Sequence, residues 1–424
     1  MRNLLKTTWL VPVFLFLLSS GHAQGDFVPN YDESKIPPYA LPDPLQRTDG
    51  SVIKSTSDWE KRKKEIFEYF QREVYGISPV WDGKMEVREI SKNESAIGGT
   101  AIRQELKLTL SREGRSLDMF VLLYLPKSAK ASPVFLGLNF YGNHTVTDDK
   151  DILVTGAWIR NNETYHSENN RASEKGRGLR KDAWPVEEII GRGYGVATLY
   201  YGELDPDFDD GFKNGVHALY PQQRDSSSWG SIAGWAWGLS RMMDYLETHA
   251  GVDKKKVAVL GHSRLGKAAL WAGALDERFA MVISNNSGCG GAALSRRKFG
   301  ETVGRINTAF PHWFADRFKS YNDRENELLV DQHQLIALMA PRPVYIASGV
   351  EDTWADPKGE FLGGLEASPV YGLFGKEGMP VSEMPAVDQP VMGTIGYHVR
   401  SGGHGLTRYD WKQYLEFADK HWGK

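Results

Sequence analysis

The chain has 424 residues, and its 51 basic and 54 acidic side chains leave a formal net charge of −3. A balance this close to neutral argues against a dedicated nucleic-acid-binding protein, which would carry a basic face. The single cysteine, Cys289, excludes an intramolecular disulfide framework and a zinc site built from cysteines. With 41% hydrophobic residues, the chain can bury most of its unfolded surface in a large core.

The first 23 residues have the pattern of a secretory signal peptide. Arg2 and Lys6 precede an apolar run at 9–18, and a small residue, Ala23, follows it. The run is shorter than the roughly 20 apolar residues that a membrane-spanning helix needs. We therefore expect cleavage after Ala23 and a secreted or periplasmic protein without a membrane span; a retained membrane anchor is the alternative.

The mature chain, residues 24–424, is expected to form one α/β domain with an N-terminal extension. Residues 24–50 are rich in proline and aspartate, which suits an irregular lead-in. The sequence Ser-Asp-Trp-Glu at 57–60 is a capping box that predicts a helix start, and residues 84–126 alternate as strands do. The polar stretch 145–185 has the composition of an insertion in this scaffold.

From residue 134 onward, short apolar runs are separated by amphipathic segments. Continuous apolar strands that alternate with helices indicate a mainly parallel central sheet flanked by helices, a three-layer α/β sandwich. The expected strands are 134–138, 195–199, 257–260, 281–283 and 344–347, and the expected helices include 235–248 and 268–274.

A glycine-flanked turn connects one of these strands to a helix. The turn, Gly-His-Ser-Arg-Leu-Gly at 261–266, has the context of a nucleophile elbow, in which a sharp bend lifts a serine hydroxyl above the sheet. The helix N-terminus that follows favours negative charge near a reacting carbonyl group. The second glycine, Gly266, comes three residues after the serine and not two. We interpret Ser263 as a nucleophile; a purely structural turn is the alternative.

A serine nucleophile needs a base to accept its proton and an acid to orient that base. In α/β-hydrolases these partners follow in the order serine, acid, histidine, each at the end of a late strand. Asp352 comes just past the buried strand 344–347. His404 lies in a glycine-rich loop after a further expected strand around residues 397–400. The sequence therefore predicts an α/β-hydrolase fold with the triad Ser263, Asp352 and His404, and with Glu351 and Asp356 as alternative acids.

Four short motifs lie around these residues. They are Gly-His-Ser-Arg-Leu-Gly-Lys at 261–267, Ser-Gly-Cys-Gly-Gly at 287–291, Glu-Asp-Thr-Trp-Ala-Asp-Pro at 351–357 and Gly-Gly-His at 402–404. Together they resemble the bacterial glucuronoyl esterases of carbohydrate esterase family 15, and the resemblance extends over roughly residues 100–424. In that family Ser-Arg-x-Gly-Lys replaces the usual Gly-x-Ser-x-Gly, which accounts for the displaced glycine.

The resemblance implies a secreted serine esterase that needs no cofactor and no metal. It implies hydrolysis, through an acyl-enzyme, of the ester that joins a (4-O-methyl-)glucuronic acid of glucuronoxylan to a lignin alcohol. A monomer that binds neither nucleic acid nor membrane is expected. An acetyl xylan or feruloyl esterase of the same fold is the main alternative, and a non-catalytic carbohydrate-binding relative is another.

The resemblance also assigns roles to residues beside the triad. Arg264, next to the nucleophile, is implied as the oxyanion stabiliser, and a guanidinium there could meet the charge that develops on the carbonyl oxygen. Many relatives carry a glutamate where this chain has Asn286, so the acid should be Asp352. Lys267, Glu301 and Trp354 match positions that hold the glucuronate ring. A surface cation, a surface salt bridge and a core tryptophan are the respective alternatives.

Overall fold

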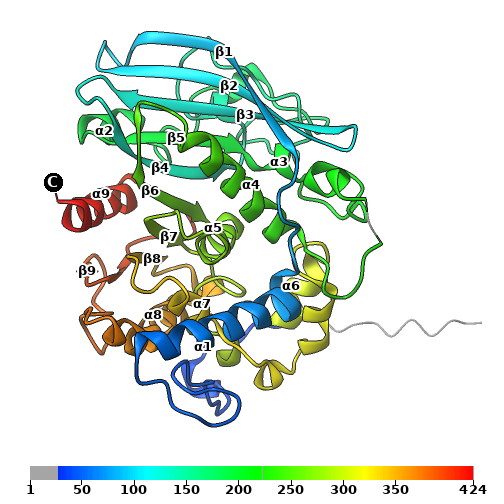
Figure 1. Ribbon diagram of the computed structural model, residues 1–424, viewed down its shortest axis with the longest axis vertical. Coiled ribbons are helices and arrows are strands. Elements are labelled where there is room, and N and C mark those ends of the chain that lie inside the picture. The colour runs from blue at the N-terminus through cyan, green and yellow to red at the C-terminus, as the bar shows by residue number, and fades with distance from the viewer. Residues whose placement is uncertain (1–26, 222, 424) are drawn as a thin grey trace, which may run out of the picture.

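The computed structural model describes residues 27–221 and 223–423, in which one large twisted sheet has helices on both faces (Figure 1). The predicted signal peptide, residues 1–23, lies outside the described residues. The strands are β1 (Lys84–Ala96), β2 (Ala101–Arg112), β3 (Arg115–Pro126), β4 (Ser132–Asn139), β5 (Gly195–Tyr200), β6 (Val252–His262), β7 (Met281–Asn285), β8 (Val344–Gly349), β9 (Val391–Met392) and β10 (Ile395–Arg400).

The middle of the sheet is parallel and its edges are antiparallel. Strands β5, β4, β6, β7, β8 and β10 pair in parallel in that order. Strands β1, β2 and β3 form an antiparallel meander that joins β5, and β9 pairs antiparallel with β10. This confirms the predicted mainly parallel α/β sheet. The strand order reverses between β4 and β6, and ligands of open α/β sheets bind beyond the carboxyl ends of strands at such a switch point.

Helices cover both faces of the sheet. Helices α2 and α9 pack on one face, while α4, α5 and α8 pack on the other. Side chains of β3 alternate accordingly: Val121 and Leu123 join one core, and Leu122 and Tyr124 the other. The helices are α1 (Thr56–Tyr69), α2 (Val186–Gly191), α3 (Tyr201–Leu204), α4 (Ser231–Leu246), α5 (Arg264–Leu275), α6 (Val303–Ala309), α7 (Gln332–Ala337), α8 (Pro357–Leu373) and α9 (Arg408–Trp422).

The predicted start of the first helix is wrong by two residues. Helix α1 begins at Thr56 and its N-cap is Ser55, not Ser57. The Ser55 hydroxyl accepts a hydrogen bond from the Asp58 N–H (3.1 Å) and donates one to the Asp58 carboxylate (2.8 Å). The serine-x-x-acid pattern occurs twice, at 55–58 and at 57–60. The first copy caps the helix because Ser55 has the extended backbone conformation that an N-cap requires.

The polar stretch 145–185 lies between β4 and α2. Its regular structure is limited to short 3₁₀ turns at Asn143–Thr145 and Glu174–Gly176 and a few isolated bridges. Side chains fix its path: the Arg177 guanidinium donates to the carbonyls of Asp149 (2.6 Å) and Ile152 (2.9 Å). The stretch is therefore an ordered set of loops beside the carboxyl end of β4.

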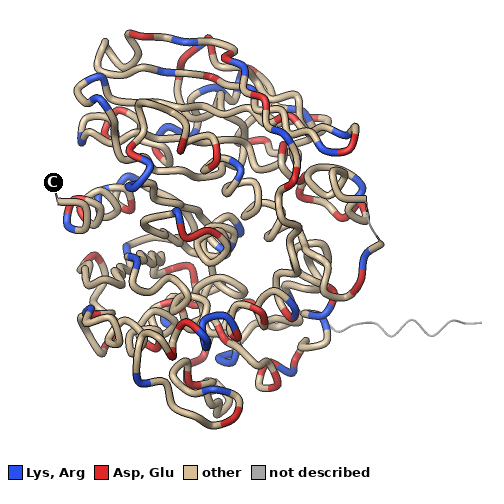
Figure 2. The backbone as a smooth tube through the Cα atoms, in the orientation of Figure 1, with Lys and Arg blue, Asp and Glu red and all other residues tan. Residues whose placement is uncertain are grey.

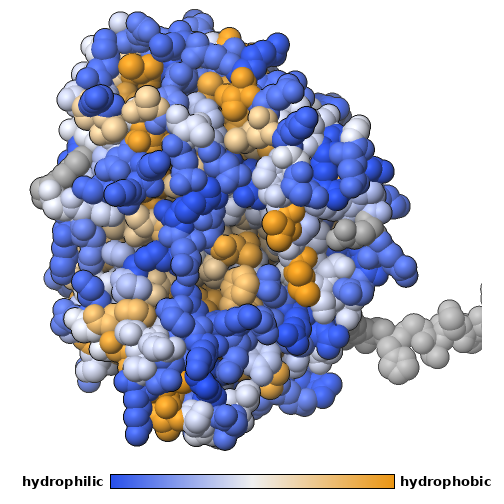
Figure 3. Space-filling model, in the orientation of Figure 1, coloured by the Kyte–Doolittle hydropathy of each residue, from blue (hydrophilic) through white to orange (hydrophobic). Residues whose placement is uncertain are grey.

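The surface carries charges of both signs, distributed over the whole fold (Figure 2). Hydrophilic side chains cover most of the face in Figure 3, and hydrophobic ones form separate small groups. Within residues 27–221 and 223–423, no helix has the length and apolar character required to cross a bilayer.

Candidate active site

Ser263 occupies the corner between β6 and α5. Its backbone has φ 58° and ψ −131°, a conformation that costs a residue with a side chain about 1–3 kcal/mol. The Ser263 N–H donates to the carbonyl of Asn285 at the end of β7 (2.8 Å), which helps to hold this strained turn. The side chain lines two cavities, one on each side of it.

Two glycines allow the corner to be this tight. A Cβ atom on Gly261 would lie 1.9 Å from the carbonyl oxygen of Leu265, so no other residue fits there. A Cβ atom on Gly266 would lie 3.0 Å from the Ser287 side chain, in the loop after β7. The glycine three residues after the serine is thus the one that faces the neighbouring loop, which explains its displacement.

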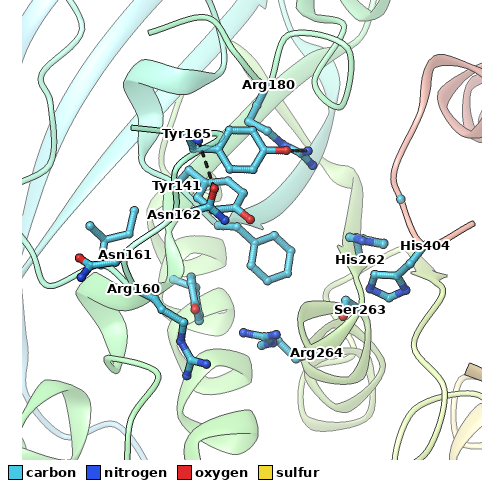
Figure 4. Close-up of a pocket in the computed structure, with 14 residues that line it drawn as sticks. Tyr141, Arg160, Asn161, Asn162, Tyr165, Arg180, His262, Ser263, Arg264 and His404 are labelled. Atoms are coloured by element: carbon cyan, nitrogen blue, oxygen red, sulfur yellow. Dashed lines mark hydrogen bonds between the residues drawn. The ribbon is translucent and has the colours of Figure 1, made fainter. Parts of the chain in front are cut away.

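His404 and Asp352 form a hydrogen-bonded pair beside Ser263. The His404 Nδ1 atom lies 2.6 Å from the Asp352 Oδ2 atom, which leaves Nε2 for a second partner. Burial of Asp352 raises the pKa of its carboxyl, but the hydrogen bonds from His404 and Asn286 outweigh this and hold the pKa below its usual value. Figure 4 shows the imidazole next to Ser263, and both residues line the same two cavities.

The two alternative acids lie elsewhere. Glu351 is exposed, and neither cavity beside Ser263 includes it. Asp356 pairs with Arg297 (2.8 Å) and caps α8 by accepting the Gly359 N–H (2.9 Å). The structure therefore brings together the three residues that the sequence predicts as the triad, and of the three candidate acids it places Asp352 against His404.

Asn286 contacts the predicted acid, Asp352, directly. Its amide donates to the Asp352 Oδ2 atom (2.7 Å). The neighbouring loop is fixed by Glu360, a fully buried residue of α8, which accepts the N–H groups of Ser287 (2.7 Å) and Gly288 (3.0 Å). Burial raises the pKa of the Glu360 carboxyl to about 7. Sequence reasoning missed both roles; the only signal for Glu360 is an acid inside an otherwise apolar helix segment.

The loop that carries His404 is held by Arg400, the last residue of β10. The Arg400 guanidinium donates to the carbonyls of Gly403 (2.9 Å) and Gly405 (2.7 Å), on either side of His404. Its Nε atom pairs with Asp410, which is fully buried (3.0 Å). This clamp fixes the backbone of a glycine-rich loop that would otherwise have considerable conformational freedom.

Arg264 is anchored by a buried carboxylate. Its guanidinium pairs with Asp207, whose oxygens also accept hydrogen bonds from Trp313 Nε1 (2.8 Å), His312 Nε2 (3.0 Å) and the Tyr201 hydroxyl (3.1 Å). Burial opposes ionisation of Asp207, but these donors and the Arg264 charge outweigh it and lower the pKa. The guanidinium is thereby fixed on the cavity wall beside the serine (Figure 4).

The first cavity, of about 300 Å³, extends from Ser263 towards Lys267, Glu301 and Trp354. Lys267 is buried and donates to the Ser287 carbonyl, so it is not a surface cation. Burial lowers the pKa of Lys267 and raises that of Glu301, and each charge partly offsets the effect on the other. Trp354 is 37% exposed and so belongs to the cavity rim, not to the core.

The second cavity, also about 300 Å³, lies on the other side of Ser263 and has an aromatic wall. The rings of Tyr141 and Tyr165 lie 3.9 Å apart between centroids, and Arg180 donates to the Tyr165 hydroxyl (2.7 Å; Figure 4). Six of the 14 lining residues, Tyr165 and Arg180 among them, come from the 145–185 stretch. The sequence predicted that stretch as an insertion but gave no signal for its contact with the site.

In the part of the chain that the structure describes, no three or more His, Cys, Asp and Glu side chains are arranged to hold a metal ion.

A strained serine at a strand–helix corner and a histidine–aspartate pair at the ends of late strands, on a mainly parallel sheet, define an α/β-hydrolase. Comparison with known proteins shows to which family within this class the chain belongs. The family model described as "Glucuronyl esterase, fungi" matches residues 189–375. The carbohydrate esterase MZ0003, from an unknown prokaryotic organism, is 51% identical over 399 residues, which cover 92% of this chain and 92% of that protein.

Solved structures of similar proteins indicate the same family. A promiscuous CE15 esterase from a marine bacterial metagenome superimposes with a TM-score of 0.88 at 50% identity, covering 93% of this chain and 100% of that one. A glucuronoyl esterase from Solibacter usitatus superimposes with a TM-score of 0.86 at 46% identity, covering 92% and 100%. The chain belongs to carbohydrate esterase family 15, which confirms the resemblance, and it is a carboxylic ester hydrolase.

Proposed function

We propose that this chain hydrolyses esters of glucuronic acid, such as those that link (4-O-methyl-)glucuronoxylan to lignin alcohols, through an acyl-serine intermediate. One observation carries the proposal: Ser263, backed by His404 and Asp352, lies where a cavity lined by Lys267 and Glu301 meets a cavity with an aromatic wall. Family membership and the name of the Solibacter usitatus relative support the substrate class.

In the acylation step, His404 Nε2 takes the proton of the Ser263 hydroxyl as the oxygen attacks the ester carbonyl. The hydrogen bond from Nδ1 to Asp352 fixes the tautomer and stabilises the imidazolium that forms. When the tetrahedral intermediate collapses, the carbon–oxygen bond to the alcohol breaks. Because an alkoxide is a poor leaving group, His404 then delivers the proton to the departing alcohol.

The negative charge on the carbonyl oxygen is met by Arg264 and by the N-terminus of α5. The first N–H groups of a helix have no intrahelical acceptor, and the helix dipole favours an anion there. The buried carboxylate of Asp207 fixes the guanidinium in advance, so little reorganisation is needed as the charge develops. Water then attacks the acyl-serine with His404 as base, which releases glucuronate and regenerates Ser263.

The two cavities have different chemical character, and we assign them to the two halves of the ester. The first cavity offers an ammonium, a carboxylate and an indole, which can hydrogen-bond and stack on a sugar ring. The second offers two tyrosine rings and a guanidinium, which suit an aromatic alcohol. The acyl half therefore binds beside Lys267 and Glu301, and the alcohol half beside Tyr141 and Tyr165.

The site of action follows from the substrate. A polymer of the plant cell wall cannot enter a cell, so we propose that residues 1–23 direct export and that the mature protein acts outside the cytoplasm.

The test compares hydrolysis of benzyl glucuronate, acetylated xylan and a feruloylated arabinoside by the purified mature chain. We expect cleavage of benzyl glucuronate with the highest kcat/KM. Faster deacetylation or release of ferulate would contradict the proposal and favour the alternative esterases, and no turnover of any ester would favour a binding protein.

A further inference from the structure

A third cavity lies away from Ser263 and is unrelated to the triad. It has a volume of about 380 Å³, and its lining residues come from the start of β3 and from the loop that leads from α3 to α4. Three cations, Arg115, Lys213 and Arg224, line it, and no carboxylate of the described residues does. The rest of the lining includes His217 and the aromatic residues Phe212, Tyr220 and Trp229.

Among the described residues, none of the three cations takes part in an ion pair of 4 Å or less, and no carboxylate lines the cavity. The Arg224 guanidinium lies over the Phe212 ring, 3.5 Å from its centroid, and donates to the Trp229 carbonyl. Burial lowers the pKa of Arg224, and the charges of Asp316, Asp205 and Asp225 partly offset this effect. The cations of the lining are therefore available as charged donors to an anion in the cavity.

His217 adds a buried imidazole whose ring nitrogens make no hydrogen bond among the described residues. It is 2% exposed, and its ring lies between Phe212 (4.8 Å between centroids) and Trp229 (4.5 Å). Neither ring nitrogen makes a hydrogen bond in the described structure, although Nε2 lies 3.5 Å from Asp205. A buried polar atom left in this way costs about 1–3 kcal/mol. An oxygen-bearing ligand in the cavity would offer it a partner.

Two backbone hydrogen bonds connect the lining of the third cavity to the catalytic centre. Trp229 lines the third cavity, and the next residues pack against the segment that anchors Asp207: Ser231 N–H donates to the His312 carbonyl (2.9 Å) and Ile232 N–H to the Trp313 carbonyl (3.1 Å). Trp313 in turn lines the cavity of Lys267 and Glu301. The two cavities are therefore connected through the backbone of residues 229–232 and 312–313.

We propose that the third cavity binds the carboxylate of a second uronic acid substituent on the acidic polysaccharide that carries the scissile ester. The size suits a monosaccharide unit, the cations suit its carboxylate, and the aromatic side chains suit its ring. The identity of the ligand rests on the proposed function. A second contact on one polymer raises its effective concentration at Ser263 without changing the chemistry.

The test uses an acidic xylo-oligosaccharide with free glucuronic acid groups, which is not an ester, in isothermal titration calorimetry with the full mature chain. The double variant Arg115→Ser/Lys213→Ser removes two exposed cations of the cavity. The control variant Lys61→Ser/Lys64→Ser makes the same charge change with two exposed residues of α1. We expect the cavity variant to bind the oligosaccharide about tenfold more weakly, which corresponds to the loss of one charge-assisted hydrogen bond. The control variant should bind it as tightly as the unaltered protein does.

Three results would overturn the proposal: equal binding by both variants and the unaltered protein, equal binding of a neutral xylo-oligosaccharide, or stronger binding of inorganic phosphate than of the uronate. The kcat/KM on benzyl glucuronate should be the same in all three proteins, since this small ester cannot span both cavities. A failure of the proposed function would appear in that ester assay alone, so the two failures are distinguishable.

Discussion

Replacing Asp207 with Asn tests how Arg264 is held. The Asp207 carboxylate pairs with Arg264 and accepts hydrogen bonds from Trp313, His312 and Tyr201. An amide keeps the shape of the carboxylate but has one acceptor oxygen and no charge, so it cannot satisfy all four donors. We expect the guanidinium to leave its position beside the nucleophile.

The size of the effect follows from the burial of the pair. Removing one partner of a buried ion pair costs about 3–5 kcal/mol. Since Arg264 keeps 24% of its side chain exposed, the lower value applies, and the free energy of unfolding should fall by about 3 kcal/mol. Displacement of an oxyanion donor should lower kcat about 10²-fold. KM should change little, because the lost contact forms in the transition state.

The assay measures kcat and KM on benzyl glucuronate for Asp207→Asn, Arg264→Gln and the double variant. If Asp207 acts through Arg264, the double variant is no slower than Arg264→Gln alone. Asp276→Asn is the matched control, because Asp276 pairs with Arg278 (2.6 Å) away from the site, and it should lose stability while kcat stays constant. If the fold-losses in kcat of the two single variants instead multiply in the double variant, Asp207 does not act through Arg264 and the reasoning is refuted.

Three further predictions follow from the same contacts. Asp352→Asn should lower kcat about 10³–10⁴-fold, whereas Glu351→Gln should keep a near-normal kcat; the opposite result would move the acid to Glu351. Because the Glu360 carboxyl has a pKa of about 7, above its unfolded value near 4.5, its contribution to stability is complete below pH 4.5 and is lost as the pH rises through 7. As the pH rises from 5 to 8, the free energy of unfolding of Glu360→Gln should therefore rise by about 3 kcal/mol relative to that of the unaltered protein, measured by urea unfolding. A difference between the two proteins that does not change with pH would contradict this. Gly266→Ala should lower both stability and kcat because its Cβ crowds the Ser287 loop, whereas Gly372→Ala, with no atom within 4 Å, should stabilise α8 by about 0.5–1 kcal/mol; equal effects on thermal unfolding would refute the steric argument.

The sequence predicted the parallel strands and the serine corner because their signals are local. A buried parallel strand is a continuous apolar run, and Gly261 of the corner is required by a contact four residues along the chain, with the Leu265 carbonyl. Asp352 and His404 could be placed because each directly follows such a strand. Their hydrogen bond joins positions 52 residues apart, yet the order of the elements made it foreseeable.

The supporting residues could not be predicted in the same way. Asp207, Glu360 and Arg400 act through contacts that appear only when distant segments meet, and each is one of many charged residues in the chain. The aromatic wall has the same origin, since Tyr165 reaches Tyr141 through the folding of the polar stretch 145–185, which has no periodicity. Local pattern therefore identifies the groups that we propose react, and long-range packing determines what holds them.

The most direct test of the central claim is labelling of the serine by an ester-like phosphonate, followed by intact-mass and peptide mass spectrometry. The account predicts one phosphonyl group on Ser263, with loss of turnover of benzyl glucuronate in proportion to labelling. The Ser263→Ala variant should keep its thermal unfolding midpoint, remain unlabelled and fail to cleave the ester. Near-normal turnover by that variant, or full inactivation by a label on another residue, would contradict the account.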